Sequence, residues 1–140
     1  MAELTVAEVA YAAGILDGEG CICITKQRSD RHHKRGYEMK LLVSIGNTDF
    51  SLLEWLRARF GGSIYSYSKS GNGRKPIGQW HLDSRKAIPF LKAVLPYLVI
   101  KQAQAELALD FQVGRVHTNR LTDEEDKLQV AQYLQMKKLK

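Results

Sequence analysis

The sequence predicts an α+β fold of order αββαββα, in which a four-stranded antiparallel sheet carries helices on one face. Two observations support it. The apolar residues keep a helical period up to residue 17 and then alternate from residue 21, and a second helix with two more alternating segments follows from residue 49. One or two further helices are expected after these seven elements.

The first half of the chain predicts a helix and a hairpin. Thr5 and Glu8 have the spacing of a capping box, and the helix that they begin is expected to end near Asp17, where glycines follow. From Cys21 the apolar residues alternate, which predicts a strand, and alternation resumes over residues 38–45 after a basic stretch. We therefore expect a long hairpin directly after the first helix.

The second half begins with the same order. Asp49 or Thr48 is expected to cap a helix that runs to Phe60 and ends at two glycines. Alternating residues over 63–70 and 77–82 then predict a second hairpin, with a glycine-rich turn between its strands.

Helices are expected to complete the chain. Ser84 is expected to cap a helix that Pro96 breaks, and a further helix is expected from Val99 to about Gln112. The spacing of Thr122 and Glu125 predicts another capping box and a last amphipathic helix.

The composition fits one domain over residues 1–140, with a core over about 5–112 and a C-terminal helix over about 122–138: 44% of the residues are hydrophobic and 26% are charged. There is no run of eighteen apolar residues and no signal peptide, so we expect no membrane partner and an intracellular protein of a bacterium, a phage or an organelle. Cys21 and Cys23 are expected to be reduced thiols.

Charge is unevenly distributed along the chain. The net charge is −4 over residues 1–19, +10 over residues 20–101 and 0 over residues 102–140. A basic middle segment without an amphipathic basic helix favours nucleic acid over a membrane as the partner. A solvated basic surface without any partner is the alternative.

Strand parity predicts which side chains cover the face of the sheet that lacks helices. A polar sheet face of this kind can read base edges in the major groove while cations at its border bind phosphates, although an ordinary solvated face has the same pattern. The expected DNA-contacting residues are Cys23, Thr25, Gln27, Arg28, Ser29, Arg31, Lys34, Arg35, Glu38, Lys40, Leu42, Ser44, Tyr65, Tyr67, Lys69, Arg74, Lys75, Gln79 and His81.

Residues 12–20, AAGILDGEG, resemble the nine-residue LAGLIDADG motif of homing endonucleases. They share its small residue, first glycine, apolar positions, two acids and last glycine, and depart from it at Ala12, Gly18 and Glu19. The resemblance extends over most of residues 5–112. It implies the LAGLIDADG homing-endonuclease fold and an enzyme that hydrolyses both strands of a long pseudo-palindromic double-stranded DNA site.

A single copy of the motif implies a homodimer in which the motif helices of two subunits meet. Ala10, Ala13 and Gly14 lack bulk on one helical face, so a partner helix can approach closely. Together with Asp17 at the end of the helix, these residues are the expected dimer interface.

The same dimer predicts a metal site. It brings two copies of Glu19 together beside two helix C-termini, and these carboxylates repel each other unless a cation lies between them. Oxygen ligands favour Mg²⁺, or Mn²⁺, with the backbone carbonyl of Gly18 as a further ligand. The metal is expected to activate water for attack on the phosphodiester.

Glu19 is the first expected catalytic residue, and the resemblance implies two more. Asn47 stands where the family places a polar residue at the edge of the pocket, and Lys101 matches a lysine that neutralises charge on the phosphate. Asn47 as a plain cap of the following helix and Lys101 as one more exposed cation are the alternatives. An RNA-splicing maturase, with RNA as its partner, and a DNA-binding regulator that does not cleave are the rival functions.

Overall fold

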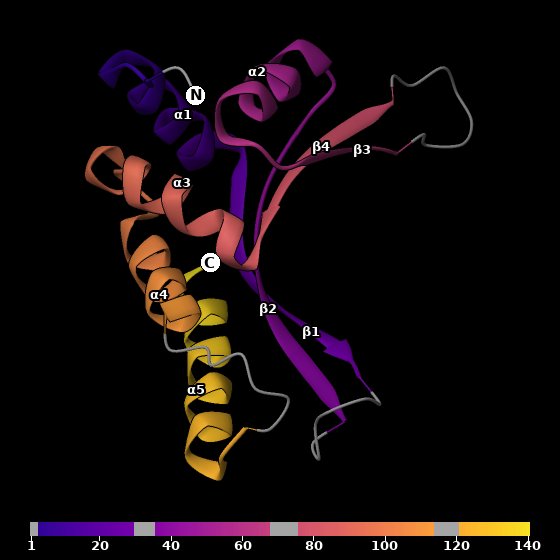
Figure 1. Cartoon of the computed structure of the whole chain (residues 1–140), viewed down its shortest axis with the longest axis vertical. Coiled ribbons are helices and arrows are strands. Elements are labelled where there is room, and N and C mark those ends of the chain that lie inside the picture. The colour runs from indigo at the N-terminus through magenta and orange to yellow at the C-terminus, as the bar shows by residue number, and fades with distance from the viewer. Residues whose placement is uncertain (1–2, 30–35, 68–75, 114–120) are drawn as a thin grey trace.

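The structure is a computed structural model that describes residues 3–29, 36–67, 76–113 and 121–140 (Figure 1). Its element order confirms the predicted αββαββα arrangement with two further helices. The elements are α1 (Val6–Glu19), β1 (Gly20–Arg28), β2 (Tyr37–Asn47), α2 (Phe50–Phe60), β3 (Ser63–Tyr67), β4 (Ile77–Asp83), the short 3-10 helices η1 (Ser84–Lys86) and η2 (Leu95–Tyr97), α3 (Ala87–Val94), α4 (Gln102–Val113) and α5 (Asp123–Leu139).

The four strands form one antiparallel sheet in the order β1-β2-β4-β3. Inward-facing residues of the strands, such as Ile22, Val43 and Trp80, are buried in the core together with residues of the helices. In Figure 1 the helices lie to one side of the sheet, and the other side is a concave surface between the far ends of the two hairpins. The described part of the chain places no helix on that outer face.

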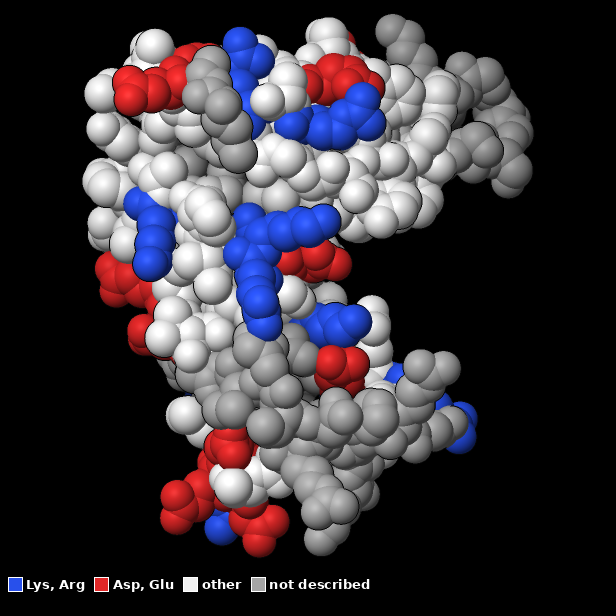
Figure 2. All heavy atoms as spheres, viewed as in Figure 1, with Lys and Arg blue, Asp and Glu red and all other residues white. Residues whose placement is uncertain are grey.

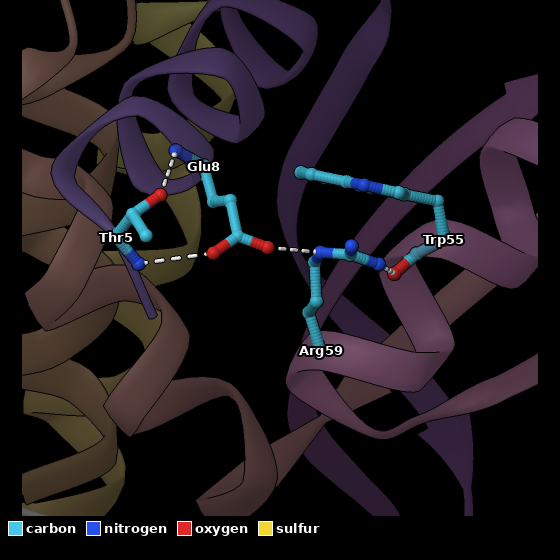
Figure 3. A network of polar contacts seen from close by, with 4 residues as sticks. All are labelled: Thr5, Glu8, Trp55 and Arg59. Carbon is cyan, nitrogen blue, oxygen red and sulfur yellow. Dashed lines mark hydrogen bonds and ion pairs between the residues drawn. The ribbon is translucent and has the colours of Figure 1, made fainter. Parts of the chain in front are cut away.

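A polar network joins the start of α1 to α2 (Figure 3). Thr5 and Glu8 form the predicted capping box, with hydrogen bonds of 3.0 and 3.1 Å, and Glu8 also forms an ion pair with Arg59 of α2. The Arg59 guanidinium lies 4.4 Å from the centroid of the Trp55 ring and donates to the Trp55 carbonyl. The network therefore ties the N-terminal half of α1 to a second helix.

Three predicted boundaries were wrong. Helix α1 continues past Asp17 to Glu19, because the chain turns into the sheet only at Gly20, whose N–H still donates to the Leu16 carbonyl. Ser84 caps no helix: its φ of 51° lies outside the extended conformation of a helix cap, and it begins the 3-10 helix η1 instead.

Helix α4 begins at Gln102 rather than Val99, the third wrong boundary. The backbone N–H groups of residues 99–101 donate to a side chain of α1, as described below, so they precede the helix. The predicted capping box of Thr122 and Glu125 is present at the start of α5. No helix among the described residues is long and apolar enough to cross a membrane.

Candidate active site

Asp17, in the last turn of α1, organises the segment that leads into α4. Its carboxylate accepts hydrogen bonds from the backbone N–H groups of Val99, Ile100 and Lys101, at 2.7, 3.2 and 3.0 Å. Burial alone raises the pKa of Asp17, but these three donors and the Lys101 charge together lower it below its usual value. Asp17 is therefore a structural anion that connects two segments 82 residues or more apart in the sequence.

Lys101 is placed at the C-terminal end of α1 by the same contact. Its Nζ donates to the backbone carbonyl of Asp17 at 2.8 Å. A lysine near a helix C-terminus interacts favourably with the negative end of the helix dipole. The predicted catalytic cation thus lies at the end of the helix that also carries Glu19.

Glu19 and Asn47 are in direct contact. Asn47 Nδ2 donates to Glu19 Oε2 at 3.0 Å, and Asn47 Oδ1 accepts from the N–H of Asp49 at 2.8 Å. Asp49 is the residue that caps α2, because its carboxylate accepts from the N–H of Ser51. Asn47 is therefore not the helix cap; its amide is held at both ends and fixes one oxygen of Glu19.

The expected dimer residues lie in different environments. Gly14 is exposed, as is Gly18, the expected metal ligand, and an added Cβ meets nothing within 4 Å at either position. Ala13, by contrast, is 0% exposed because it packs into the core of its own chain, so its place in the interface was a wrong prediction. Ala10 is half-buried, and the Asp17 carboxylate is engaged within the chain.

Apolar side chains are exposed close to these glycines. Tyr11 of α1 is 56% exposed, and Val99 and Ile100, which Asp17 holds at the end of α1, are 85% and 73% exposed. Contiguous exposed apolar groups commonly mark an interaction surface.

The outer face of the sheet carries the predicted polar side chains in cross-strand rows. Ser44 pairs with Cys21 on one side and His81 on the other, and Gly46 pairs with Gln79, which in turn pairs with Tyr65. Thr25 Oγ1 donates to the Lys40 carbonyl at 3.2 Å. The other described members are Cys23, Gln27, Ser29, Glu38, Leu42 and Tyr67. Arg28, an expected cation of the border, ends β1 with the parity of the buried Ile22 and Ile24.

Six predicted DNA contacts lie outside the described residues, namely Lys69 of the expected sheet face and the border cations Arg31, Lys34, Arg35, Arg74 and Lys75. Figure 2, in the same view as Figure 1, shows the molecule hollowed along the side of the sheet that bears no helix, with acidic and basic side chains interspersed.

Two residues of this region were missed by the sequence reasoning. Asp83 pairs with Leu42 and has the parity of Gln79 and His81, so extending the strand by one residue predicts its place. Lys140 lies close enough to Cys21 to lower the pKa of its thiol, and no pattern of nearby residues in the sequence predicts that residue 140 lies beside β1. A hydrogen bond from Cys23, with Lys140 and Lys101 nearby, lowers the pKa of Cys21 to about 5, while the pKa of Cys23 is raised.

The chain matches a protein-family model over most of its length. A family model described as LAGLIDADG endonuclease matches residues 12–101, which include Glu19, Asn47 and Lys101. No curated protein sequence matches the chain significantly.

Solved structures share the fold. The homing endonuclease I-CvuI, in complex with the I-CreI target in 2 mM Mg with the DNA not cleaved, aligns with a TM-score of 0.81 and 18% identity, over 96% of this chain and 82% of that one. The archaeal intron-encoded homing endonuclease I-Vdi141I, complexed with DNA, gives 0.79 and 20% over 96% and 84%. The LAGLIDADG homing endonuclease I-SmaMI bound to cleaved DNA gives 0.76 and 20%, and this chain spans 47% of its length.

Proposed function

Because this chain belongs to the LAGLIDADG endonuclease family, and is thus a site-specific DNA endonuclease, we propose that it is a homodimeric, metal-dependent enzyme with one active site shared by two subunits. The observation that carries the proposal is the bond between Glu19 and Asn47, at the end of α1 and beside the outer face of the sheet. It presents a fixed carboxylate next to the surface that is to receive DNA.

The dimer rests on the exposed side of α1. Gly14 leaves open space, and exposed apolar side chains lie one turn before it, at Tyr11, and beside Asp17 at the end of α1, at Val99 and Ile100. A second copy that crosses at Gly14 covers this surface and brings its own Glu19 to the two-fold axis.

The described residues of one chain do not by themselves supply a full donor set for a divalent ion. Among the described residues, no group of three or more His, Cys, Asp or Glu side chains is placed to hold a metal. Two copies of Glu19, the Gly18 carbonyls and phosphate oxygens of DNA together form an oxygen-only set that fits Mg²⁺ or Mn²⁺. Such an ion supplies activation of water and stabilisation of the leaving oxygen.

The remaining residues have separate tasks. Asn47 positions Glu19 by holding Oε2, and Lys101 places a positive charge where the cleaved phosphate gains negative charge. Asp17 acts through Lys101 by holding its backbone at the end of α1. Side chains of the outer face contact bases, and the border cations contact phosphates.

The test is to incubate the protein with a library of DNA duplexes and magnesium and to score double-strand breaks by sequencing the ends. We expect breaks at one long site, none with a chelator, and recovery when magnesium or manganese is added. Sequence-specific binding without breaks in any divalent ion indicates the non-cleaving regulator. Binding of structured RNA in preference to every duplex indicates the maturase.

A further inference from the structure

Gln79 and His81 form a hydrogen-bonded pair in the middle of the outer face. They are two residues apart on β4, so both face outward while Trp80 between them is buried. His81 Nε2 lies 2.9 Å from Gln79 Oε1. A carbonyl oxygen only accepts, so this contact requires the tautomer in which Nε2 carries the proton and donates it.

The His81 ring is itself held in place. It lies against Tyr65 on β3, with the ring centroids 4.9 Å apart, and it is half-buried. Burial lowers the pKa of His81, against an opposing effect of Asp83, so the ring is mostly neutral at pH 7 and has one N–H. The one N–H group of the neutral ring therefore donates to Gln79 Oε1.

Gly46 leaves room for the Gln79 amide on the opposite side. The two residues pair across β2 and β4, and a Cβ at position 46 lies 3.6 Å from Gln79 Cγ and 3.9 Å from Gln79 Nε2. The side chain therefore extends along the glycine with its oxygen turned to His81. The amide nitrogen, with two donors, remains for another partner.

We propose that His81 binds the amide oxygen of Gln79, so that only the N–H groups of Gln79 are available to contact a base. Each subunit then selects guanine over adenine at one base pair of its half-site. The inference rests on the proposed function, because it requires DNA on the outer face. Guanine presents two acceptors, O6 and N7, in the major groove, whereas bidentate recognition of adenine needs both the oxygen and the nitrogen of the amide. With its oxygen turned to His81, Gln79 matches guanine.

The experiment selects bound duplexes from randomised DNA and compares base frequencies for the full chain and its variants. We expect the unmodified protein to enrich guanine over adenine about tenfold at one position in each half. His81→Phe keeps a ring against Tyr65 but removes the donor, and we expect it to shift that position towards adenine. Gln79→Glu only accepts hydrogen bonds and is expected to shift the same position towards cytosine.

Two further variants separate positioning from folding. His81→Gln can still donate through its amide nitrogen and is expected to restore guanine, which a merely structural role of the ring does not predict. Ser63→Ala alters the neighbour of His81 on β3 without touching the pair and is expected to leave the preference unchanged.

The outcomes distinguish this inference from the function on which it rests. If the unmodified protein selects no sequence, the proposed function fails and this inference fails with it. If it selects a site but Gln79→Glu changes no base, or His81→Phe selects the same base as the unmodified protein, only the inference is overturned. If His81→Phe or Gln79→Glu does not unfold cooperatively on heating, Gln79→Ala takes its place. This variant must then select the four bases about equally at that one position.

Discussion

Asp17 and Glu19 lie two residues apart at the end of α1 and have different roles. Asp17 is occupied by three backbone donors, while Glu19 is exposed and has one oxygen bonded to Asn47. A carboxylate that is saturated by amides is a poor metal ligand, whereas Glu19 retains lone pairs for one. At the scale of single residues, the candidate chemistry therefore centres on Glu19.

Glu19→Gln is expected to abolish cleavage while DNA binding survives. The substitution removes the charge that ligates metal and preserves the shape of the side chain. Cleavage is measured with the selected duplex and magnesium, and binding by fluorescence anisotropy in calcium. Substantial cutting by the variant removes Glu19 from the mechanism.

Asn47→Ala is expected to lower the cleavage rate by about 10–100-fold, as is typical when a partner that orients a ligand is lost. The affinity for DNA should change little, since the amide contacts Glu19 and the backbone of Asp49. Thr48→Ala, on the next residue, is the matched control. Equal cleavage rates for the two variants contradict a positioning role for Asn47.

At the scale of elements, the network of Thr5, Glu8 and Arg59 sets how α1 lies against α2. The end of α1 that carries Glu19 is tied separately by Asp17 to the segment before α4. Helix α1 is thus held at both ends by carboxylates, with small or exposed residues between them on its outer side. This arrangement leaves that side available to a partner while its direction is fixed.

The Glu8 network predicts a dependence of stability on pH. The hydrogen bond from the Thr5 backbone, followed by the interaction with Arg59, lowers the pKa of Glu8 below its usual 4.5. A carboxyl with a lowered folded-state pKa stabilises the fold above its unfolded-state pKa, and this contribution is lost as the pH falls through the folded-state value.

Glu8→Gln should therefore lower the free energy of unfolding at neutral pH, and the difference from the unmodified protein should shrink below about pH 4.5. Urea unfolding of both proteins at a series of pH values measures this difference in the free energy of unfolding. Glu3→Gln, which removes an acid from the segment before α1, controls for net charge. A difference that stays constant down to pH 2 rejects this account of Glu8.

At the scale of the whole molecule, the proposed function requires a second subunit on the open side of α1 and a duplex on the outer face of the sheet. Strand β1 has nine residues, so it spans about 30 Å at roughly 3.3 Å per residue, or about nine base pairs. In the proposed dimer, two such faces and a central gap are expected to set the length of the target.

Gly14→Leu is expected to produce a folded monomer. A Cβ added at this position meets nothing within 4 Å in its own chain, so the substitution should not disturb the fold. The larger side chain is expected to prevent the partner helix from approaching closely. Sedimentation should show a dimer for the unmodified protein at micromolar concentration and a monomer for the variant, with Gly14→Ala in between. A monomeric unmodified protein, both alone and on DNA, excludes a shared active site.

The footprint on the selected site is expected to cover roughly twenty base pairs with pseudo-two-fold symmetry. Replacing Arg31, Lys34 or Arg35 should weaken binding nearly equally across sequences and reduce the salt slope by about one, as the loss of a phosphate contact does. Nuclease protection and titrations at several salt concentrations give these values. A protected tract of about ten base pairs indicates that one sheet face alone meets DNA.

The sequence by itself determined the local features: both capping boxes, the change of period at the end of α1, the parity of the outer face and the motif that carries Glu19. Each depends on residues a few positions apart, whose geometry follows from the helix or the strand in which they lie. Parity therefore placed Gln79 and His81 on one face, but it gave neither their hydrogen bond nor the tautomer.

Only the tertiary structure decided which distant segments meet. The pairing of β2 with β4 sets the rows of the outer face, and the packing of α1 buries Ala13 while it leaves Gly14 exposed. The tertiary structure also brings Asp17 to residues 99–101 and Asn47 to Glu19. These contacts depend on strand order and on the angles between helices, which are set by burial of the whole core rather than by the spacing of neighbouring residues.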